Sequence, residues 1–164
     1  MLTQEKVKEL FDYREDGSLI WKTKRNKGLV AGGLHKISGY FRTRCGRGAQ
    51  IPVHRIVFLW HHGYLPKMID HIDRDPQNNR IKNLRECTHQ QNMFNRVANA
   101  NTETRHKGIE RTKGGRWMAR YRHNKKSYRA GTFNTEEEAA RAHDDAVREL
   151  HGEFFRPNII EGAE

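Results

Sequence analysis

The sequence predicts an α+β protein assembled from two small units. Residues 69–95 read as two short strands followed by a helix, and residues 107–158 read as three strands followed by one long helix. The composition agrees, because 35% hydrophobic residues and a mean hydropathy of −1.00 are low for one large core in a chain of 164 residues. We therefore expect a sheet packed on a helix in each half.

The first half begins with a short helix and a basic β region. Residues 3–12 place apolar side chains at the i, i+3 and i+4 spacing of a helix. Asp16-Gly17 is typical of a turn, and residues 18–22 and 39–44 have the character of strands. This part of the chain should form a small β-rich layer.

Between Trp21 and Gln50 there are eight Lys or Arg residues and no Asp or Glu. Two interpretations stay open for this stretch. It could be a solvated, loop-rich β region, or its cations, Lys22 and Lys24 among them, could hold the phosphates of a nucleic-acid duplex. Contacts of the second kind position a protein on DNA without reading its sequence.

Residues 51–66 predict a buried helix. Val53, Ile56 and Trp60 recur at helical spacing, and Gly63 is a suitable residue at which to end the helix.

The most informative segment follows, IDHIDRDPQNNRIKNLRECTHQQNMFN at residues 69–95. Its expected strands end near His71 and cover residues 81–85, and its expected helix carries Asn92. A hairpin followed by a helix can bring a strand-end Asp70-His71 pair and a helical Asn together around one metal ion.

These motifs resemble the HNH nucleases of the phage and intron homing type, whose fold is a ββα-metal unit. The resemblance implies that His71 is the general base and that Asp70 and Asn92 bind a divalent metal. It also implies that Asn83, in "IKNL", braces the loop that holds His71. Many members have His at the position of Asn92, although Asn is common in the homing subgroup.

The resemblance extends back to about residue 50, because the homing subgroup also has the His54-Arg55 pair upstream of its Asp-His motif. We expect Arg55 to contact DNA. His54 is expected to have a structural or phosphate-contacting role, because His71 better fits the role of the base.

The chemistry supports the nuclease interpretation independently. Phosphodiester hydrolysis needs a water molecule deprotonated near pH 7, where the ordinary pKa of His lies. It also needs a cation that neutralises the phosphate and the leaving oxygen. Oxygen ligands from Asp and Asn favour Mg²⁺ or Mn²⁺ over zinc.

The formal net charge of +11 indicates an acidic partner, most simply nucleic acid. The charge alone would also fit RNA, a ribosome or an anionic membrane. No apolar run approaches the roughly 18 residues of a membrane span, so we expect no membrane partner. With nucleic acid as the expected partner, we expect no small-molecule substrate either. Cys45 and Cys87 form no CxxC pair, which argues against a zinc cluster. Two isolated cysteines favour a reducing cytoplasm, which would be that of the bacterial host if the gene is phage-encoded.

The second half has a sharp division of charge. Residues 105–131 carry ten basic residues and one acidic residue, whereas residues 134–153 carry seven acidic and two basic residues. The basic part predicts strands at residues 108–111, 116–122 and 127–132, and the acidic part predicts a helix that covers their apolar face.

The opposite face of this sheet should be basic. Arg116, Arg120 and Arg122 alternate with apolar residues on the middle strand, and Arg129 joins them from the third. An open face of arginines can lie in the major groove of duplex DNA.

The second half resembles the plant APETALA/ethylene-response-factor DNA-binding domain, through "KGI", "GRWMARYR", "GTF", "TEEEAARAHDDAVRELHGE" and "PN". By position, the resemblance implies groove contacts from Lys107, Arg120, Arg122 and Arg129. Glu110, Thr112 and Gly114 depart from the family pattern, which puts the GC-box specificity of the plant proteins in doubt.

Together these patterns predict a nuclease domain at residues 1–96, a linker at 97–106 and a DNA-binding domain at 107–164. The expected function is metal-dependent hydrolysis of duplex DNA by a phage-type or homing endonuclease. One rival is a DNA-binding regulator with an inactive nuclease site, and the other is an RNA-binding protein. The oligomeric state is not readable from the sequence.

Overall fold

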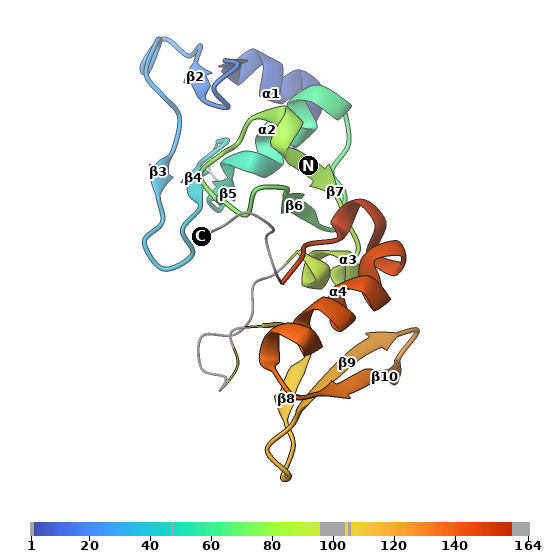
Figure 1. Ribbon diagram of the computed structural model, residues 1–164. Helices are drawn as coiled ribbons and strands as arrows, with labels where there is room; N and C mark the ends of the chain where they lie inside the picture. Colours follow the sequence, from blue (N-terminus) through green and yellow to red (C-terminus); the bar gives the residue numbers. More distant parts are fainter. Residues whose placement is uncertain (1, 47, 96–103, 105, 159–164) are drawn as a thin grey trace. The chain divides into compact units, whose positions relative to one another are not determined.

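The computed structural model describes residues 2–46, 48–95, 104 and 106–158. Helices and antiparallel sheets alternate along the chain, which confirms the α+β prediction. The chain forms two compact units, Met1–His89 and Gln90–Glu164 (Figure 1). Most of the expected linker at 97–106 lies outside the described residues, so the boundary at residue 96 stays a prediction.

The first unit contains small antiparallel sheets and two main helices. In chain order its elements are α1 (Gln4–Leu10), β1 (Phe11–Tyr13), β2 (Leu19–Trp21), β3 (Gly33–Leu34), β4 (Phe41–Thr43), β5 (Ile51–Pro52), α2 (Val53–His62), β6 (Ile69–His71), the 3₁₀ helix η1 (Ile81–Asn83) and β7 (Leu84–Glu86). Helix α3 (His89–Phe94) follows and crosses into the second unit. The strands pair as β1-β2, β3-β4-β5 and β6-β7.

Helix α2 lies at the centre of the core of this unit. Ile56 and Val57 are fully buried in one cluster with Val7 of α1. The helix ends where its sequence predicts, because Gly63 adopts a φ of 79° and its N–H donates to the Leu59 carbonyl.

Two elements differ from their predictions. The first helix ends at Leu10, and Phe11 instead begins β1, where it lies opposite Trp21 with ring centroids 4.4 Å apart. The strand expected at residues 81–85 begins as the 3₁₀ turn η1, because the Asn83 N–H donates to the Arg80 carbonyl at 2.8 Å.

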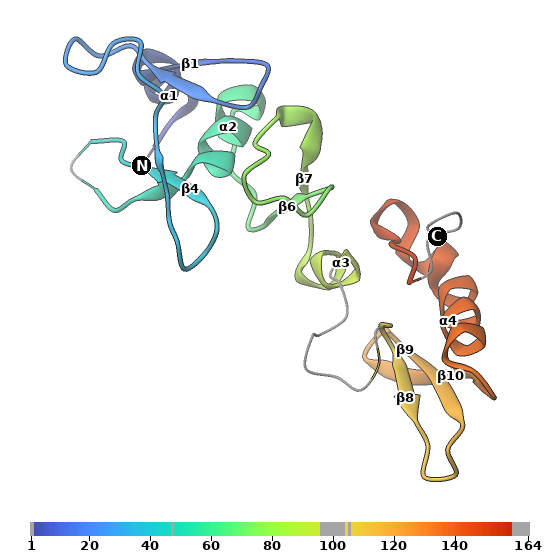
Figure 2. The same ribbon diagram turned by 60° about the vertical axis from the view of Figure 1, so that its left-hand side comes forward.

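The second unit is a three-stranded antiparallel sheet of order β10-β9-β8, covered by one long helix. Its elements are β8 (Ile109–Arg111), β9 (Trp117–His123), β10 (Lys126–Phe133), α4 (Glu136–His151) and the 3₁₀ helix η2 (Gly152–Phe154). Figure 2 shows α4 lying along one face of this sheet. The predicted order of three strands and a helix is confirmed.

Helix α4 is fixed at its start and along its apolar side. Thr135 and Glu138 form a capping box at the N-terminus. Ala139 and Ala140 are fully buried against Ile109 and Ala119 of the sheet. Among the described residues, the chain has no helix that is both long enough and apolar enough to cross a membrane.

Candidate functional site

Strand β6 carries the Asp-His pair inside the first unit. Asp70 and His71 are 6% and 5% exposed, and the register places Asp70 opposite Arg85 and His71 opposite Leu84 on β7. A buried carboxylate and a buried imidazole in adjacent positions need polar partners to offset their desolvation.

The partner of Asp70 is Arg85, a residue that no sequence motif indicated. The Arg85 guanidinium donates to Oδ2 of Asp70 from Nε at 3.0 Å and from Nη2 at 2.8 Å. Both side chains are largely buried. This charge-assisted contact fixes the carboxylate, so a cation bound at Asp70 would share it with Arg85.

The imidazole of His71 faces Asn79. Nε2 of His71 lies 3.4 Å from Oδ1 of Asn79. Burial lowers the pKa of His71, and the Asn79 contact and the nearby carboxylates, led by Asp73, offset only part of this effect. His71 is therefore neutral near pH 7, which is the state that can accept a proton.

Two further rings surround His71. The His54 ring, from the start of α2, packs edge-on against it at 5.0 Å between centroids. Tyr40 lies 5.0 Å from the His54 ring and 5.7 Å from the His71 ring. Burial, followed by the charges of His71, Arg55 and Arg42, lowers the pKa of His54 to about 3. Nδ1 of His54 is buried without a hydrogen-bond partner among the described residues.

Asn83 braces the loop that follows His71. Its Oδ1 accepts from the Asp73 N–H at 3.0 Å, and its Nδ2 donates to Oδ1 of Asp73 at 2.8 Å and to the Asn78 carbonyl at 2.9 Å. Its own carbonyl accepts from the Ile72 N–H at 2.9 Å. These contacts hold both ends of the loop, although the contribution of Asn83 to catalysis stays a prediction.

The β1-β2 hairpin supports the same loop from outside. Gly17 has a φ of 91°, and a Cβ there would lie 2.5 Å from the backbone of Asn79 and Arg80. The Ile81 N–H also donates to the Tyr13 hydroxyl at 3.1 Å. Only glycine fits at this contact, which packs the hairpin against Asn79, the residue that faces His71.

Asn92, the second expected metal ligand, is half-buried on α3 beyond the boundary of the first unit. The described residues contain no group of three or more His, Cys, Asp or Glu side chains that could hold a metal ion. Asp70 and Asn92 belong to different units, so their joint binding of Mg²⁺ or Mn²⁺ stays a prediction from the sequence motif.

The sheet of the second unit presents the predicted basic face. Arg120 and Arg129 are direct register partners, so their side chains share one face, and both are exposed together with Arg122. Arg120 also forms an ion pair of 2.9 Å with Glu110, and each side chain is 50% exposed. The Arg116 guanidinium donates to the Thr132 carbonyl at 2.9 Å.

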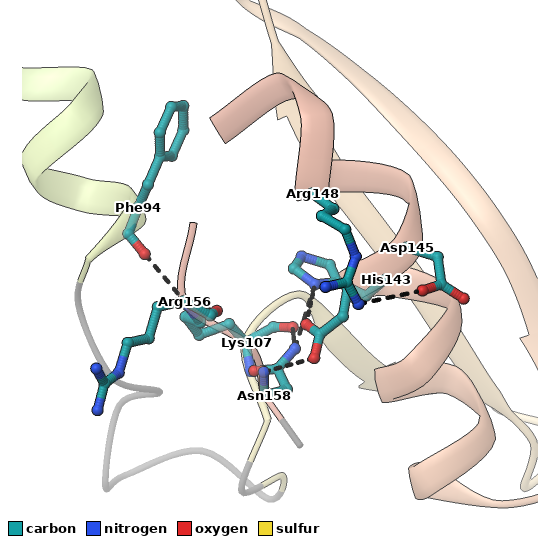
Figure 3. A network of polar contacts seen from close by, with 8 residues as sticks. Phe94, Lys107, His143, Asp145, Arg148, Arg156 and Asn158 are labelled. Carbon is teal, nitrogen blue, oxygen red and sulfur yellow. Dashed lines mark hydrogen bonds and ion pairs between the residues drawn. The ribbon is translucent and has the colours of Figure 1, made fainter. Parts of the chain in front are cut away.

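Lys107 has a different environment from the one expected of a groove-facing residue. Its ammonium donates to the carbonyls of Phe94, at 3.2 Å, and Arg156, at 2.8 Å, and its N–H donates to Oδ1 of Asn158 (Figure 3). These bonds tie together segments of the second unit. These contacts give Lys107 a packing role that does not require DNA, and its expected contact with the groove stays a prediction.

The other expected contacts in the first unit are partly engaged as well. Arg55 donates to the Pro66 carbonyl at 3.2 Å, and Lys22 donates to the Lys8 carbonyl at 3.0 Å. Lys24 is exposed.

Comparisons with known proteins match both halves of the chain. The HNH endonuclease family profile matches residues 52–94, and the AP2 domain profile matches residues 104–153. An uncharacterised HNH endonuclease of Acanthamoeba polyphaga mimivirus is 33% identical over 115 residues, which cover 68% of this chain and 59% of the viral protein.

Plant proteins match over shorter stretches. The ethylene-responsive transcription factor ERN1 of Medicago truncatula is 39% identical over 40% of this chain. The dehydration-responsive element-binding protein 1G of Oryza sativa subsp. indica is 49% identical over 30% of this chain. This chain spans a quarter of the length of each plant protein. No solved structure gives a significant match. The chain thus carries an HNH endonuclease domain and an AP2 domain in tandem.

Proposed function

We propose that this protein is a metal-dependent endonuclease that hydrolyses phosphodiester bonds in duplex DNA. The observation that carries the proposal is the buried, neutral His71 beside the Asp70–Arg85 pair, within the segment that matches HNH endonucleases. The AP2 domain and the net charge of +11 support DNA as the substrate.

His71 acts as the general base in this proposal. The neutral imidazole, held against Oδ1 of Asn79, takes a proton from the attacking water. Asn83 keeps the loop in place while His71 gains its proton. Asp70 and Asn92 would hold Mg²⁺ or Mn²⁺, which supplies charge neutralisation at the phosphate and the leaving oxygen.

The AP2 domain selects the site through Arg120, Arg122 and Arg129, and Lys24 contacts phosphates beside the nuclease. Resemblance to the homing subgroup and similarity to a viral HNH protein support a role in a mobile or phage-type element.

Incubation with supercoiled plasmid and Mg²⁺, with and without EDTA, tests the proposal. Conversion to nicked or linear plasmid only when Mg²⁺ is available supports the nuclease. The similarity to plant transcription factors favours a second candidate, a DNA-binding regulator. Sequence-selective binding without cleavage under any divalent metal would support that alternative.

A further inference from the structure

An isoleucine stands almost fully exposed at the tip of the β3-β4 hairpin. Ile37 is 94% exposed, a higher fraction than any other large apolar side chain in the described part of the chain, where the next highest is Leu29 at 61%. In both views the connection between β3 and β4 projects from the body of the first unit (Figures 1 and 2). The hairpin therefore offers an apolar side chain to something outside its own unit.

The tip is a well-defined turn. The Ser38 and Gly39 N–H groups both donate to the His35 carbonyl, at 3.1 and 2.9 Å, and the His35 N–H donates to the Tyr40 carbonyl at 2.9 Å. Nδ1 of His35 lies 2.9 Å from the Ser38 hydroxyl. These bonds order the backbone of the tip, which lowers the entropy cost of placing Ile37 on a partner.

The hairpin is also anchored to the candidate active site. Tyr40 packs against the rings of His54 and His71. Gly39, with a φ of 72°, lies so close to Pro76 that a Cβ there would be 3.3 Å from its ring. Ile37 is three residues from Tyr40, a span of at most about 11 Å. A phosphodiester held at His71 thus lies within a few base pairs of Ile37.

The segment of chain that contains the tip is basic. Lys36 is exposed beside Ile37, and Lys24, Arg25 and Lys27 are exposed earlier in the same segment. The stretch between Trp21 and Gln50 has no acidic residue. An apolar tip on a cationic segment matches a duplex, whose phosphates attract the cations and whose base stack can receive the apolar group.

We propose that Ile37 is a wedge that enters the duplex and opens a base step within a few base pairs of the scissile phosphate. This inference rests on the proposed nuclease function. Opening a step distorts the backbone locally, which gives His71 access to a phosphate that regular B-form DNA does not present.

The test uses the full chain and a short duplex that contains a mapped cleavage site. The fluorescent base 2-aminopurine is placed in turn at each step around the cut, with Ca²⁺ replacing Mg²⁺ to slow cleavage. We expect wild-type protein to raise the fluorescence at one step, and Ile37→Ala to abolish that rise while Leu29→Ala, another exposed apolar residue at 61% exposure, keeps it. Cleavage by Ile37→Ala should fall about tenfold or more and recover on a duplex with a mismatch at that step.

Thermal unfolding of Ile37→Ala should match wild type, because the side chain packs on almost nothing. An unchanged fluorescence rise in Ile37→Ala would overturn the wedge, as would equal loss of cleavage on intact and mismatched duplexes. Loss of binding to phosphatidylglycerol vesicles, or of dimerisation in light scattering, without any change on DNA would assign the tip to a membrane or to a second copy. If wild-type protein binds DNA but cleaves none, the proposed function fails, whereas the fluorescence experiment, run across a duplex whose bound sequence is footprinted, still decides the wedge.

Discussion

At the scale of single residues, His71 combines burial with a lowered pKa. The replacement His71→Ala removes the base but changes no formal charge near neutral pH, so cleavage should fall by about 10²–10⁴ while duplex binding is retained. Single-turnover cleavage and gel-shift titration measure the two effects. His62→Ala, at the exposed end of α2, is the matched control. Wild-type cleavage by His71→Ala would remove His71 from the role of base.

His54 is the residue that packs most directly on His71. Its ring holds the His71 imidazole from the side, and its buried Nδ1 has no hydrogen-bond partner among the described residues. Phe keeps an aromatic ring and removes the unsatisfied atom, so His54→Phe should retain most of kcat, whereas His54→Ala should lower kcat more than KM.

The same residue makes stability depend on pH. The pKa of His54 falls from its ordinary 6.5 to about 3 on folding, so between these pH values His54 is protonated in the unfolded chain and neutral in the folded chain. His54 therefore imposes no penalty above pH 6.5, and stability declines as the pH falls from 6.5 toward 3. Near pH 4.5 this effect lowers the free energy of unfolding by about 2–3 kcal/mol. Urea unfolding across this range should show a shallower decline for His54→Phe than for wild type, and identical slopes would contradict the assignment.

At the scale of elements, the basic face of β8-β10 is interrupted by one carboxylate. Glu110 pairs with Arg120 at 2.9 Å and remains half exposed among arginines. A carboxylate there repels phosphates, but it orients Arg120 and can accept from a cytosine amino group.

We therefore expect Glu110→Gln to bind random duplexes more tightly, with a salt dependence steeper by about one charge, and to discriminate less between sequences. Fluorescence anisotropy with a random duplex pool and with a selected site, at several salt concentrations, measures both quantities. Glu149→Gln removes an exposed charge from α4, on the other side of the sheet, and should change neither. A parallel change on both kinds of DNA would leave Glu110 with a purely electrostatic role.

The elements also show what sequence patterns can reveal. Helices α2 and α4 were predictable, because each has a sustained apolar period and a clear cap at one end, and strand β9 was predictable from its alternation of apolar and basic residues. The start of β7 was not, because the side chain of Asn83 bonds to Asp73, ten residues away. The Asp70–Arg85 pair was not predictable, because it depends on the register of two strands. The contact of Asn79 with His71 was not predictable either, because the sequence has two adjacent asparagines and only the loop conformation determines which of them faces His71.

At the scale of the whole molecule, the residues at the two ends of the segment that joins the matched domains contact each other within the second unit. The ring of Phe94, at the end of α3, stacks on His151 of α4 with centroids 3.5 Å apart. The Lys107 ammonium, beyond the linker, donates to the Phe94 carbonyl at 3.2 Å (Figure 3). Sequence patterns alone, with separate apolar faces in each half, make the linker the main connection and predict that its length sets the cleavage position.

The contacts at Phe94 predict a different outcome for a Gly-Ser insertion after Asn101. Doubling the length of a closed loop costs only about 0.6 kcal/mol, less than the stacked rings and the Lys107 bond together provide. The insertion alone should therefore leave the cleavage position sharp and unmoved, measured as nicks on an end-labelled target whose bound sequence is footprinted in parallel. The insertion combined with His151→Ala and Lys107→Met should broaden or shift the cut without changing the footprint, because the longer linker then sets the reach. A shift with the insertion alone would mean that the contacts around Phe94 open when the protein binds DNA.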